Sequence, residues 1–224
     1  MGDLAKRWRC SAAFRLGGLT ATAAVFAWLA LAPPGARSAP APGPLFEGLA
    51  ARQAALCTQQ PERVTEAWCA MRPVQVQLEG PGGRTVLLEA LAADTSQGRA
   101  AGYQFIHPDV VAGSAILFVF ERDSVGPFHM CNVQAALDIV WFRSDGRVLD
   151  RAEMHPGPAL PAGLCRALYQ PRSFGSYRYA LETPAGALEE AGIDPGSVYQ
   201  WRLALVNGPA LLAEGSSQEA MDDE

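Results

Sequence analysis

The sequence has almost no lysine, since every basic residue after Lys6 is an arginine. The chain has 224 residues, 18 basic and 23 acidic, with a net charge of −5. Residues 1–38 hold five basic residues and one acidic residue, so residues 39–224 carry 13 arginines against 22 acidic residues, a net charge of −9. Phosphate contacts need clustered positive charge. An acidic body with no basic run therefore excludes nucleic acid as the expected partner.

Glycine and proline are too few for a linker-dominated or collagen-like chain. Gly 22 and Pro 17 make up 39 of the 224 residues, below the ~25–30% that marks low-complexity chains. Hydrophobic residues make up 49% of the sequence, which is enough for a core and excludes a wholly disordered chain. The length indicates one domain with additional segments.

The sequence also lacks the short motifs of several enzyme and metal-site classes. It contains no G-x-S-x-G elbow, no phosphate-binding glycine loop, no H-E-x-x-H helix and no C-x-x-C pair. An active site would have to be built from His107, His129, Cys131, Asp138, His155 and Glu182. We therefore expect no enzymatic activity, no cofactor and no resident metal.

The first 38 residues have the order of a secretory signal. Basic residues precede an uncharged run, Leu16–Ala32, which is followed by helix breakers and small residues. Cleavage after Ser38 removes this segment, but the run is also long enough to remain as a membrane anchor. Either outcome exports the body to the periplasm or to the periplasmic face of the inner membrane, because the positive charge flanks the N-terminal side. Residues 39–44 predict a stiff proline-rich linker, and residues 207–224 an acidic flexible tail.

Four cysteines follow the signal, namely Cys57, Cys69, Cys131 and Cys165. An even number in an exported chain favours two disulfides, for which three connectivities are possible. Cys57 and Cys69 flank a short polar loop between two helical stretches, so we favour Cys57–Cys69 together with Cys131–Cys165. A copper site is the alternative use of this region, with soft ligands drawn from His129, Met130, Cys131, Met154 and His155.

The apolar pattern of the body changes from helical to strand-like at Pro73. Residues 45–72 predict two short helices joined by the first disulfide. Strands are expected at 73–79, 85–91, 115–120, 136–142, 148–154, 177–182 and 198–206, with short helices at 94–104 and after Thr183-Pro184. Tight turns between most strands indicate an α+β domain at 73–206, built on an antiparallel or mixed sheet that curls toward a barrel, with a helical extension at 45–72.

Five segments in order resemble one family. They are GYQFI at 102–106, ILFVF at 116–120, FHMCN at 128–132, ALDIVWFRSDGRV at 136–148 and YALETPAGALEEAGIDPGS at 179–197. Together they resemble the domain of unknown function 192 (DUF192) family, whose members are often labelled uncharacterised membrane-anchored proteins. The resemblance covers about residues 74–205 and implies a fold but no reaction. His129 and Cys131 replace the family's usual Trp and Lys, and the element at 102–106 lacks the family's Arg. If that Arg and Lys form a polar site in relatives, the resemblance implies that this site has been lost here.

The candidate ligand-binding residues are His129, Met130, Asn132, Asp138 and Glu182. Asp138 is the most informative, because it stands in a strand expected to be buried, where an acid must be hydrogen-bonded or paired. We favour a structural role for it, with backbone groups or an arginine as partners. The alternative is a ligand-facing role together with Asn132 and Glu182 on neighbouring strands.

These observations predict an exported, non-catalytic domain that binds a partner protein or a small ligand at the cell envelope. The extension at 45–72 lies outside the resemblance and is the candidate contact for an envelope or membrane protein, through Leu45, Phe46, Leu49 and Trp68. One alternative is a periplasmic copper-binding protein with His129, Cys131 and His155 as ligands. The other is a cysteine-dependent hydrolase with Cys131 as its nucleophile.

Overall fold

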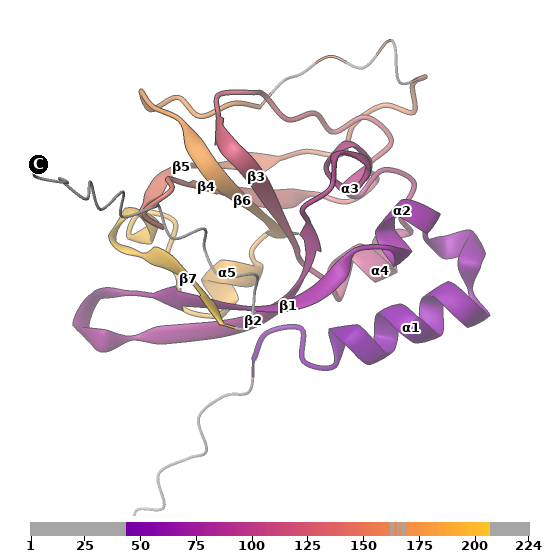
Figure 1. The fold of residues 1–224 in the computed structure, drawn as a ribbon, viewed down its shortest axis with the longest axis horizontal. Helices are drawn as coiled ribbons and strands as arrows, with labels where there is room; N and C mark the ends of the chain where they lie inside the picture. The colour runs from indigo at the N-terminus through magenta and orange to yellow at the C-terminus, as the bar shows by residue number, and fades with distance from the viewer. Residues whose placement is uncertain (1–43, 162–163, 165, 167–168, 207–224) are drawn as a thin grey trace, which may run out of the picture. The chain divides into compact units, whose positions relative to one another are not determined.

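The computed structural model describes residues 44–206, apart from 162–163, 165 and 167–168 (Figure 1). The predicted export segment, nearly all of the linker, Cys165 and the acidic tail lie outside this part. In the part that is described, no helix is both long enough and apolar enough to cross a membrane.

A seven-stranded mixed sheet forms the centre of the described fold, with the strand order β5-β4-β6-β3-β2-β1-β7. The strands are β1 (Arg72–Glu79), β2 (Thr85–Ala93), β3 (Ile116–Ser124), β4 (Leu137–Phe142), β5 (Val148–Met154), β6 (Tyr177–Pro184) and β7 (Arg202–Val206). Neighbouring strands are antiparallel except β2 and β3, which pair in parallel. The predicted α+β class with a mixed sheet is confirmed.

The two edges of this sheet meet at one point. An isolated bridge joins Arg147, just before β5, to Arg202 of β7, and the N–H of Leu203 donates to the carbonyl of Gly146 at 2.7 Å. Gly146 has φ +81°, and a Cβ there would lie 2.3 Å from the Leu203 carbonyl oxygen. Glycine is therefore required for this approach. The sheet curls toward a barrel, but no strand ladder joins β5 to β7 among the described residues.

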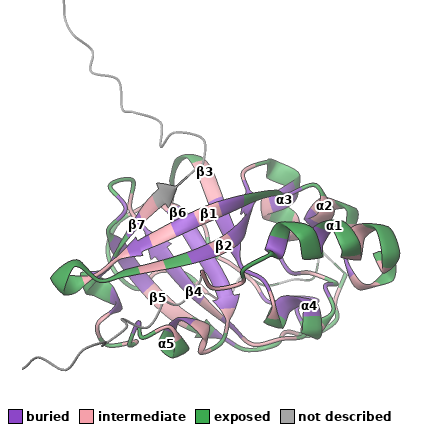
Figure 2. Ribbon diagram, turned by 90° about the horizontal axis from the view of Figure 1, so that it is seen from below, coloured by how far each residue is buried: buried purple, intermediate pink, exposed green. Residues whose placement is uncertain are grey.

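Each face of the sheet carries its own apolar cluster, and the strands are largely buried (Figure 2). On β4 the alternation assigns Ile139 and Trp141 to the first cluster, and Val140 and Phe142 to the second. Helices α1 (Leu49–Gln59), α2 (Glu66–Cys69), α3 (Ser96–Ala101) and α4 (Pro108–Ala112) contribute to or lie beside the first cluster. Helix α5 (Ala187–Glu190) and the 3₁₀ turn η4 (Val198–Gln200) contribute to the second.

Two predicted element boundaries are wrong. Thr183 and Pro184 do not cap a helix, because they continue β6 as partners of Asp138 and Leu137. Helix α5 begins only after Gly186, whose φ of +83° turns the chain out of the sheet. The last strand also starts later than expected, at Arg202, because residues 198–200 form a 3₁₀ turn instead.

The extension at 45–72 belongs to the core of the domain. The predicted Cys57–Cys69 disulfide is present and joins α1 to α2. Leu49 is 1% exposed and Trp68 is 0% exposed, both within the first cluster. Their prediction as partner contacts is wrong, because they cover the sheet of their own chain. Leu45 and Phe46 are half-buried against the second cluster, where the Leu45 backbone pairs with β2 at Leu88.

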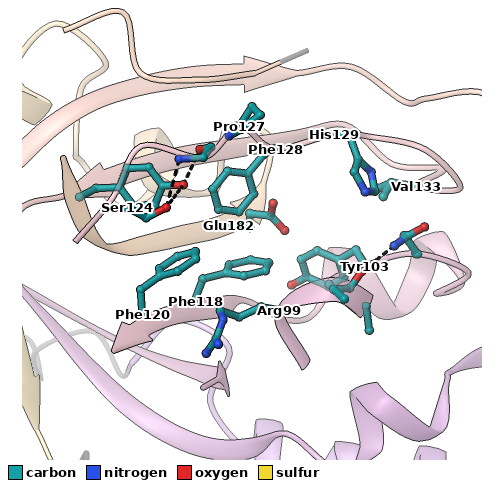
Figure 3. Close-up of a pocket in the computed structure, with 16 residues that line it drawn as sticks. Arg99, Tyr103, Phe118, Phe120, Ser124, Pro127, Phe128, His129, Val133 and Glu182 are labelled. Carbon is teal, nitrogen blue, oxygen red and sulfur yellow. Dashed lines mark hydrogen bonds between the residues drawn. The ribbon is translucent and has the colours of Figure 1, made fainter. Parts of the chain in front are cut away.

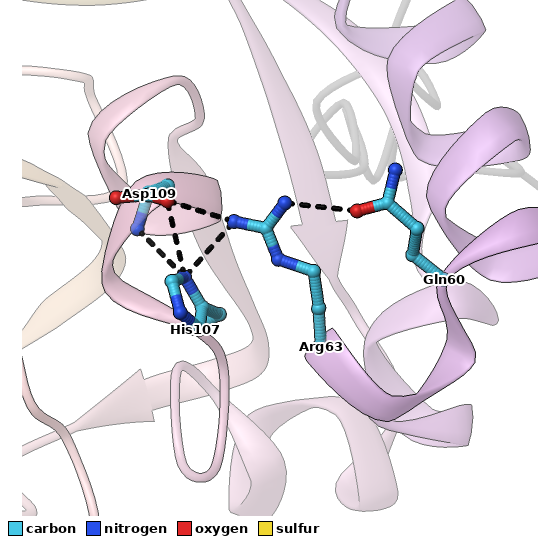
Figure 4. A network of polar contacts seen from close by, with 4 residues as sticks. All are labelled: Gln60, Arg63, His107 and Asp109. Atoms are coloured by element: carbon cyan, nitrogen blue, oxygen red, sulfur yellow. Dashed lines mark hydrogen bonds and ion pairs between the residues drawn. The ribbon is translucent and has the colours of Figure 1, made fainter.

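A polar network holds the extension to α4 (Figure 4). Arg63, in the 3₁₀ turn η1 (Pro61–Arg63), donates from Nη1 to Gln60 Oε1 at 2.8 Å. Its Nη2 lies 2.9 Å from His107 Nδ1 and 3.0 Å from Asp109 Oδ2. Because the guanidinium can only donate, Nδ1 of His107 is the acceptor. The same Nδ1 caps α4 by accepting from the N–H of Asp109 at 3.3 Å.

Candidate functional site

A pocket opens between α3, β3, the loop at 124–133 and β6, on the face of the first cluster (Figure 3). Its cavity volume is about 200 Å³. Aromatic side chains form much of its wall, namely Tyr103, Phe118, Phe120, Phe128 and Tyr177. Glu182 supplies the carboxyl group of the lining, and we call the site the Glu182 pocket.

Glu182 is an acid placed in an apolar row of the sheet. Its partners in register are Ile116 on β3 and Ile139 on β4, both fully buried. Glu182 itself is 4% exposed, and none of the described residues forms a hydrogen bond or an ion pair with its carboxyl group. Burial raises the pKa of Glu182 to about 8. At pH 7 Glu182 is therefore protonated in most molecules, because burial disfavours the charged form of its carboxyl group.

The aromatic wall is packed edge to face. Phe118 and Phe128 have ring centroids 5.1 Å apart at an angle of 88°, and Phe120 and Tyr177 lie 5.3 Å apart at 84°. Such pairs prefer this geometry because the positive ring edge meets the negative face. In the view of Figure 3 the Glu182 carboxyl group is seen beside the rings of Phe128, Phe118 and Tyr103.

The loop that carries Phe128 is held in place by polar contacts. The Tyr177 hydroxyl donates to the carbonyl of Gly126 at 2.5 Å, and Ser124 Oγ accepts from the N–H of Gly126 at 3.1 Å. Farther along, the backbone groups of Phe128 and Tyr169 pair in both directions at 2.6 and 3.1 Å. These contacts preform the wall opposite Glu182 without using the carboxyl group.

The remaining polar groups of the pocket are largely engaged. The Tyr103 hydroxyl lies 3.1 Å from Ser114 Oγ. Burial raises the pKa of Tyr103 above its ordinary value, the Ser114 bond lowers it, and the nearby Glu182 charge raises it further. Arg99 donates from Nη1 to the carbonyls of Asp94 and Val119, and its guanidinium lies 5.4 Å from the Phe120 ring centroid.

Two of the predicted ligand-binding residues, Glu182 and His129, line this pocket. Nδ1 of His129 is buried and has no hydrogen-bond partner within the described part of the chain. Met130 is buried in the first cluster and lines a separate cavity of about 290 Å³ together with Cys131 and His155. His129 and Met130 are adjacent in the chain and were predicted to lie at one site, but the structure places them in two separate cavities.

Asn132 serves the loops beside the pocket. Its φ of +61° is in the left-handed region that asparagine tolerates better than most residues. Its side chain accepts from the N–H of Leu160 at 3.0 Å and donates to the Leu160 carbonyl at 3.0 Å and to Gln104 Oε1 at 3.3 Å. The amide group is fully occupied in tying residue 160 to the turn after α3.

Asp138 lies on the other face of the sheet. It pairs with Thr183 across β4 and β6, one position from the Ile139 and Glu182 pair, and neighbouring strand positions face opposite sides. Its Oδ2 accepts from the N–H of Gly186 at 2.8 Å, and its Oδ1 lies 3.5 Å from Arg151 Nη2. These are the backbone and arginine partners expected of a structural acid. The grouping of Asp138 with Asn132 and Glu182 at one ligand is wrong.

The geometry favours neither the copper site nor the cysteine hydrolase. Cys131 is disulfide-bonded, so it offers no thiolate as nucleophile or ligand. Its predicted partner, Cys165, lies outside the described residues. The two histidines among the predicted copper ligands line different cavities, His129 the Glu182 pocket and His155 the cavity beside Cys131. Within the described ranges, no group of three His, Cys, Asp or Glu side chains is arranged to hold a metal.

The aromatic residues of the pocket were not predicted from the sequence. Phe118 and Phe120 are two positions apart on β3, so they share a face, and this alternation was the available signal. Tyr103 and Phe128 come from segments outside the sheet, and no local pattern connects them to β3.

Comparison with known proteins assigns the chain to a family. The DUF192 family model, described as an uncharacterized ACR, matches residues 74–201, more than half of the chain. The chain belongs to the DUF192 family. All residues that line the Glu182 pocket lie within the DUF192 match.

Two solved structures are similar to this DUF192 protein. One is a proposed transcription regulator from Sinorhizobium meliloti 1021, with 24% identity, a TM-score of 0.47, and coverage of 60% of this chain and 95% of that one. The other is a protein of unknown function from Novosphingobium aromaticivorans DSM 12444, with 23% identity, a TM-score of 0.43, and coverage of 63% and 97%. A search of curated proteins gives no match.

Proposed function

We propose that this DUF192 protein is exported and non-catalytic, and that it binds a small organic ligand in the Glu182 pocket. Ligand sites are typically concave and mostly apolar, with a few placed polar groups. The Glu182 pocket fits this description, since its aromatic wall surrounds a single carboxyl group.

The observation that carries the proposal is the buried carboxyl group of Glu182 without a partner among the described residues. A buried polar group without a hydrogen bond costs free energy, and such groups with shifted pKa values are concentrated at functional sites. Asp138, on the opposite face, has the partners that a purely structural acid needs. A ligand supplies the missing partner of Glu182.

Binding without catalysis is supported by the arrangement of the reactive groups. Nucleophilic catalysis needs a nucleophile within hydrogen-bond reach of its base. In the described pocket, neither His129 Nδ1 nor the Glu182 carboxyl group has such a neighbour. The Tyr103 and Tyr177 hydroxyls are engaged with Ser114 and Gly126.

Export is supported by the order of residues 1–38 and by the Cys57–Cys69 disulfide, a bond that persists in oxidising compartments. Cell fractionation of the producing bacterium tests it. We expect the oxidised chain in the periplasm or on the inner membrane, accessible to protease in spheroplasts. A protease-protected chain with reduced Cys57 and Cys69 would contradict export.

A fragment screen by protein NMR tests the ligand site. We expect small aromatic fragments to shift the resonances of Tyr103, Phe118 and Phe128. Ala100, exposed at the rim of the pocket, offers a blocking variant, Ala100→Phe, and the exposed Ala112 on α4 offers the matched control, Ala112→Phe. Binding should be weakened by Ala100→Phe and unchanged by Ala112→Phe. Equal binding by both variants, or shifts confined to other regions, would overturn the proposal.

A further inference from the structure

The Glu182 pocket has the chemistry of an ammonium site. Resting on the function proposed above, we infer that its ligand carries a positively charged ammonium group, which the Glu182 carboxylate binds beside the aromatic wall formed by Phe118 and Phe128.

Glu182 has no positively charged partner among the described residues. Ile116 and Ile139 flank it in the sheet, and no described arginine or histidine contacts its carboxyl group. A buried charge without a counter-ion is strongly disfavoured, whereas a buried ion pair offsets much of the desolvation cost. A cationic ligand therefore gains more from this pocket than a neutral ligand of the same shape.

The aromatic wall also favours a cation. The negative faces of aromatic rings attract cations. The chain already uses this attraction at Phe120, where the Arg99 guanidinium lies 5.4 Å from the ring centroid. The rings of Phe118, Phe128 and Tyr103 line the same pocket as the Glu182 carboxyl group (Figure 3).

The other titratable groups that line the pocket are compatible with a cation. Burial raises the pKa of both Tyr103 and Tyr177, so these phenols stay neutral. Arg99 is the positive group nearby, and its Nη1 is tied to two backbone carbonyls at the wall. His129 also lines the pocket, and its Nδ1 is buried with no partner in the described chain.

The size of the cavity limits the ligand. An apolar cavity of about 150 Å³ holds benzene, and the Glu182 pocket has about 200 Å³. A small amine with one ring or a short branched chain fits this volume. A phospholipid headgroup with its chains, or a folded peptide segment, does not.

Three probes of similar shape and different charge test the preference for a cation, namely benzylammonium, benzyl alcohol and benzoate. Binding to the full chain is measured by NMR titration between pH 6 and pH 8.5. We expect benzylammonium to bind about tenfold more tightly than the other two near pH 8. Its affinity should rise with pH across this range, because the pKa of Glu182 is about 8 and the carboxylate is the binding form.

Substitutions test which residues cause the preference for benzylammonium. Glu182→Gln should abolish the preference for benzylammonium while benzyl alcohol still binds, and Glu153→Gln, an exposed acid on β5, should leave it intact. Phe128→Leu keeps the apolar volume and should weaken benzylammonium selectively, which provides a second test if Glu182→Gln does not fold. Benzyl alcohol or benzoate binding as tightly as benzylammonium would overturn the ammonium inference and leave the ligand site standing. No binding by any of the three would overturn both.

Discussion

Asp138 and Glu182 lie one position out of register on β4 and β6, and their carboxyl groups face opposite sides of one sheet. Asp138 has a backbone N–H and an arginine as partners, whereas Glu182 has none among the described residues. The same residue chemistry is therefore stabilising on one face and costly on the other. The burial of Glu182 without a partner makes the stability of the protein depend on pH.

Replacing Glu182 by glutamine should stabilise the protein at pH 8. The pKa of Glu182 is about 8 in the folded chain, against an ordinary value of 4.5. The folded state therefore binds more protons than the unfolded state between these values, and the free energy of unfolding falls as the pH rises from 4.5 to 8. Glu182→Gln removes this loss, a gain on the order of a few kcal/mol at pH 8.

Urea unfolding at pH 5, 6.5 and 8 measures this effect. The advantage of Glu182→Gln over the unsubstituted chain should shrink as the pH falls toward 4.5. The exposed Glu153→Gln variant should show no such trend. An advantage that does not change with pH would contradict the assigned burial of the carboxyl group.

Asp150 should have the opposite dependence on pH. Burial acts to raise its pKa, but donors from the N–H groups of Ser173, Arg151 and Arg172 and from the Tyr199 hydroxyl together lower it. The carboxylate therefore contributes stability above its unfolded pKa, and this contribution is lost as the pH falls through its lowered folded pKa. Asp150→Asn should cost about 2–4 kcal/mol at pH 7.

Thermal unfolding at pH 7 and at pH 3 tests the Asp150 prediction. The difference between Asp150→Asn and the unsubstituted chain should be large at pH 7 and smaller at pH 3. Glu189→Gln on the exposed side of α5 serves as the control and should change stability little. A loss of equal size at both pH values would mean that packing, and not charge, accounts for the role of Asp150.

Arg63 should contribute more to the stability of the protein than the exposed Arg72. It bonds Gln60, His107 and Asp109, whereas Arg72 forms one exposed pair with Asp94 at 3.4 Å. Arg63→Ala should cost about 1–2 kcal/mol and speed amide exchange in the extension. Arg72→Ala should cost less than ~0.5 kcal/mol, as exposed pairs do. Equal effects of the two variants on exchange would count against the network as the attachment of the extension.

Removing the Cys57–Cys69 disulfide should destabilise the whole domain. The bond closes a chain segment with a sequence separation of 12 residues, for which the entropic contribution is about 3 kcal/mol. The extension holds Trp68 in the core, so its loosening should lower the single unfolding transition of the entire domain. Calorimetry of the Cys57→Ser, Cys69→Ser double variant measures this loss. A separate early transition, with the main one unchanged, would show that the extension folds independently.

Much of the fold could be predicted from short-range sequence patterns. The hairpin of β4 and β5 followed from the apolar run at 136–142 and from the Asp145-Gly146 turn after it, and the first disulfide followed from its position between two helices. The Glu182 pocket did not follow, because it depends on β6 pairing between β3 and β4, which no local pattern specifies. Leu49 and Trp68 were misassigned for a related reason. An apolar helix face has the same pattern whether it covers its own sheet or a partner.

The bridge between Arg147 and Arg202 has a consequence for the solubility of the protein. An exposed strand edge is a template on which a second chain can add a strand. The contact of Gly146 with Leu203 turns the outer strands β5 and β7 toward each other, so each edge faces the same molecule at that point. A side chain at position 146 would separate them and present both edges to other chains. Gly146 thus permits a turn and also limits the exposure of the strand edges through which two chains could associate.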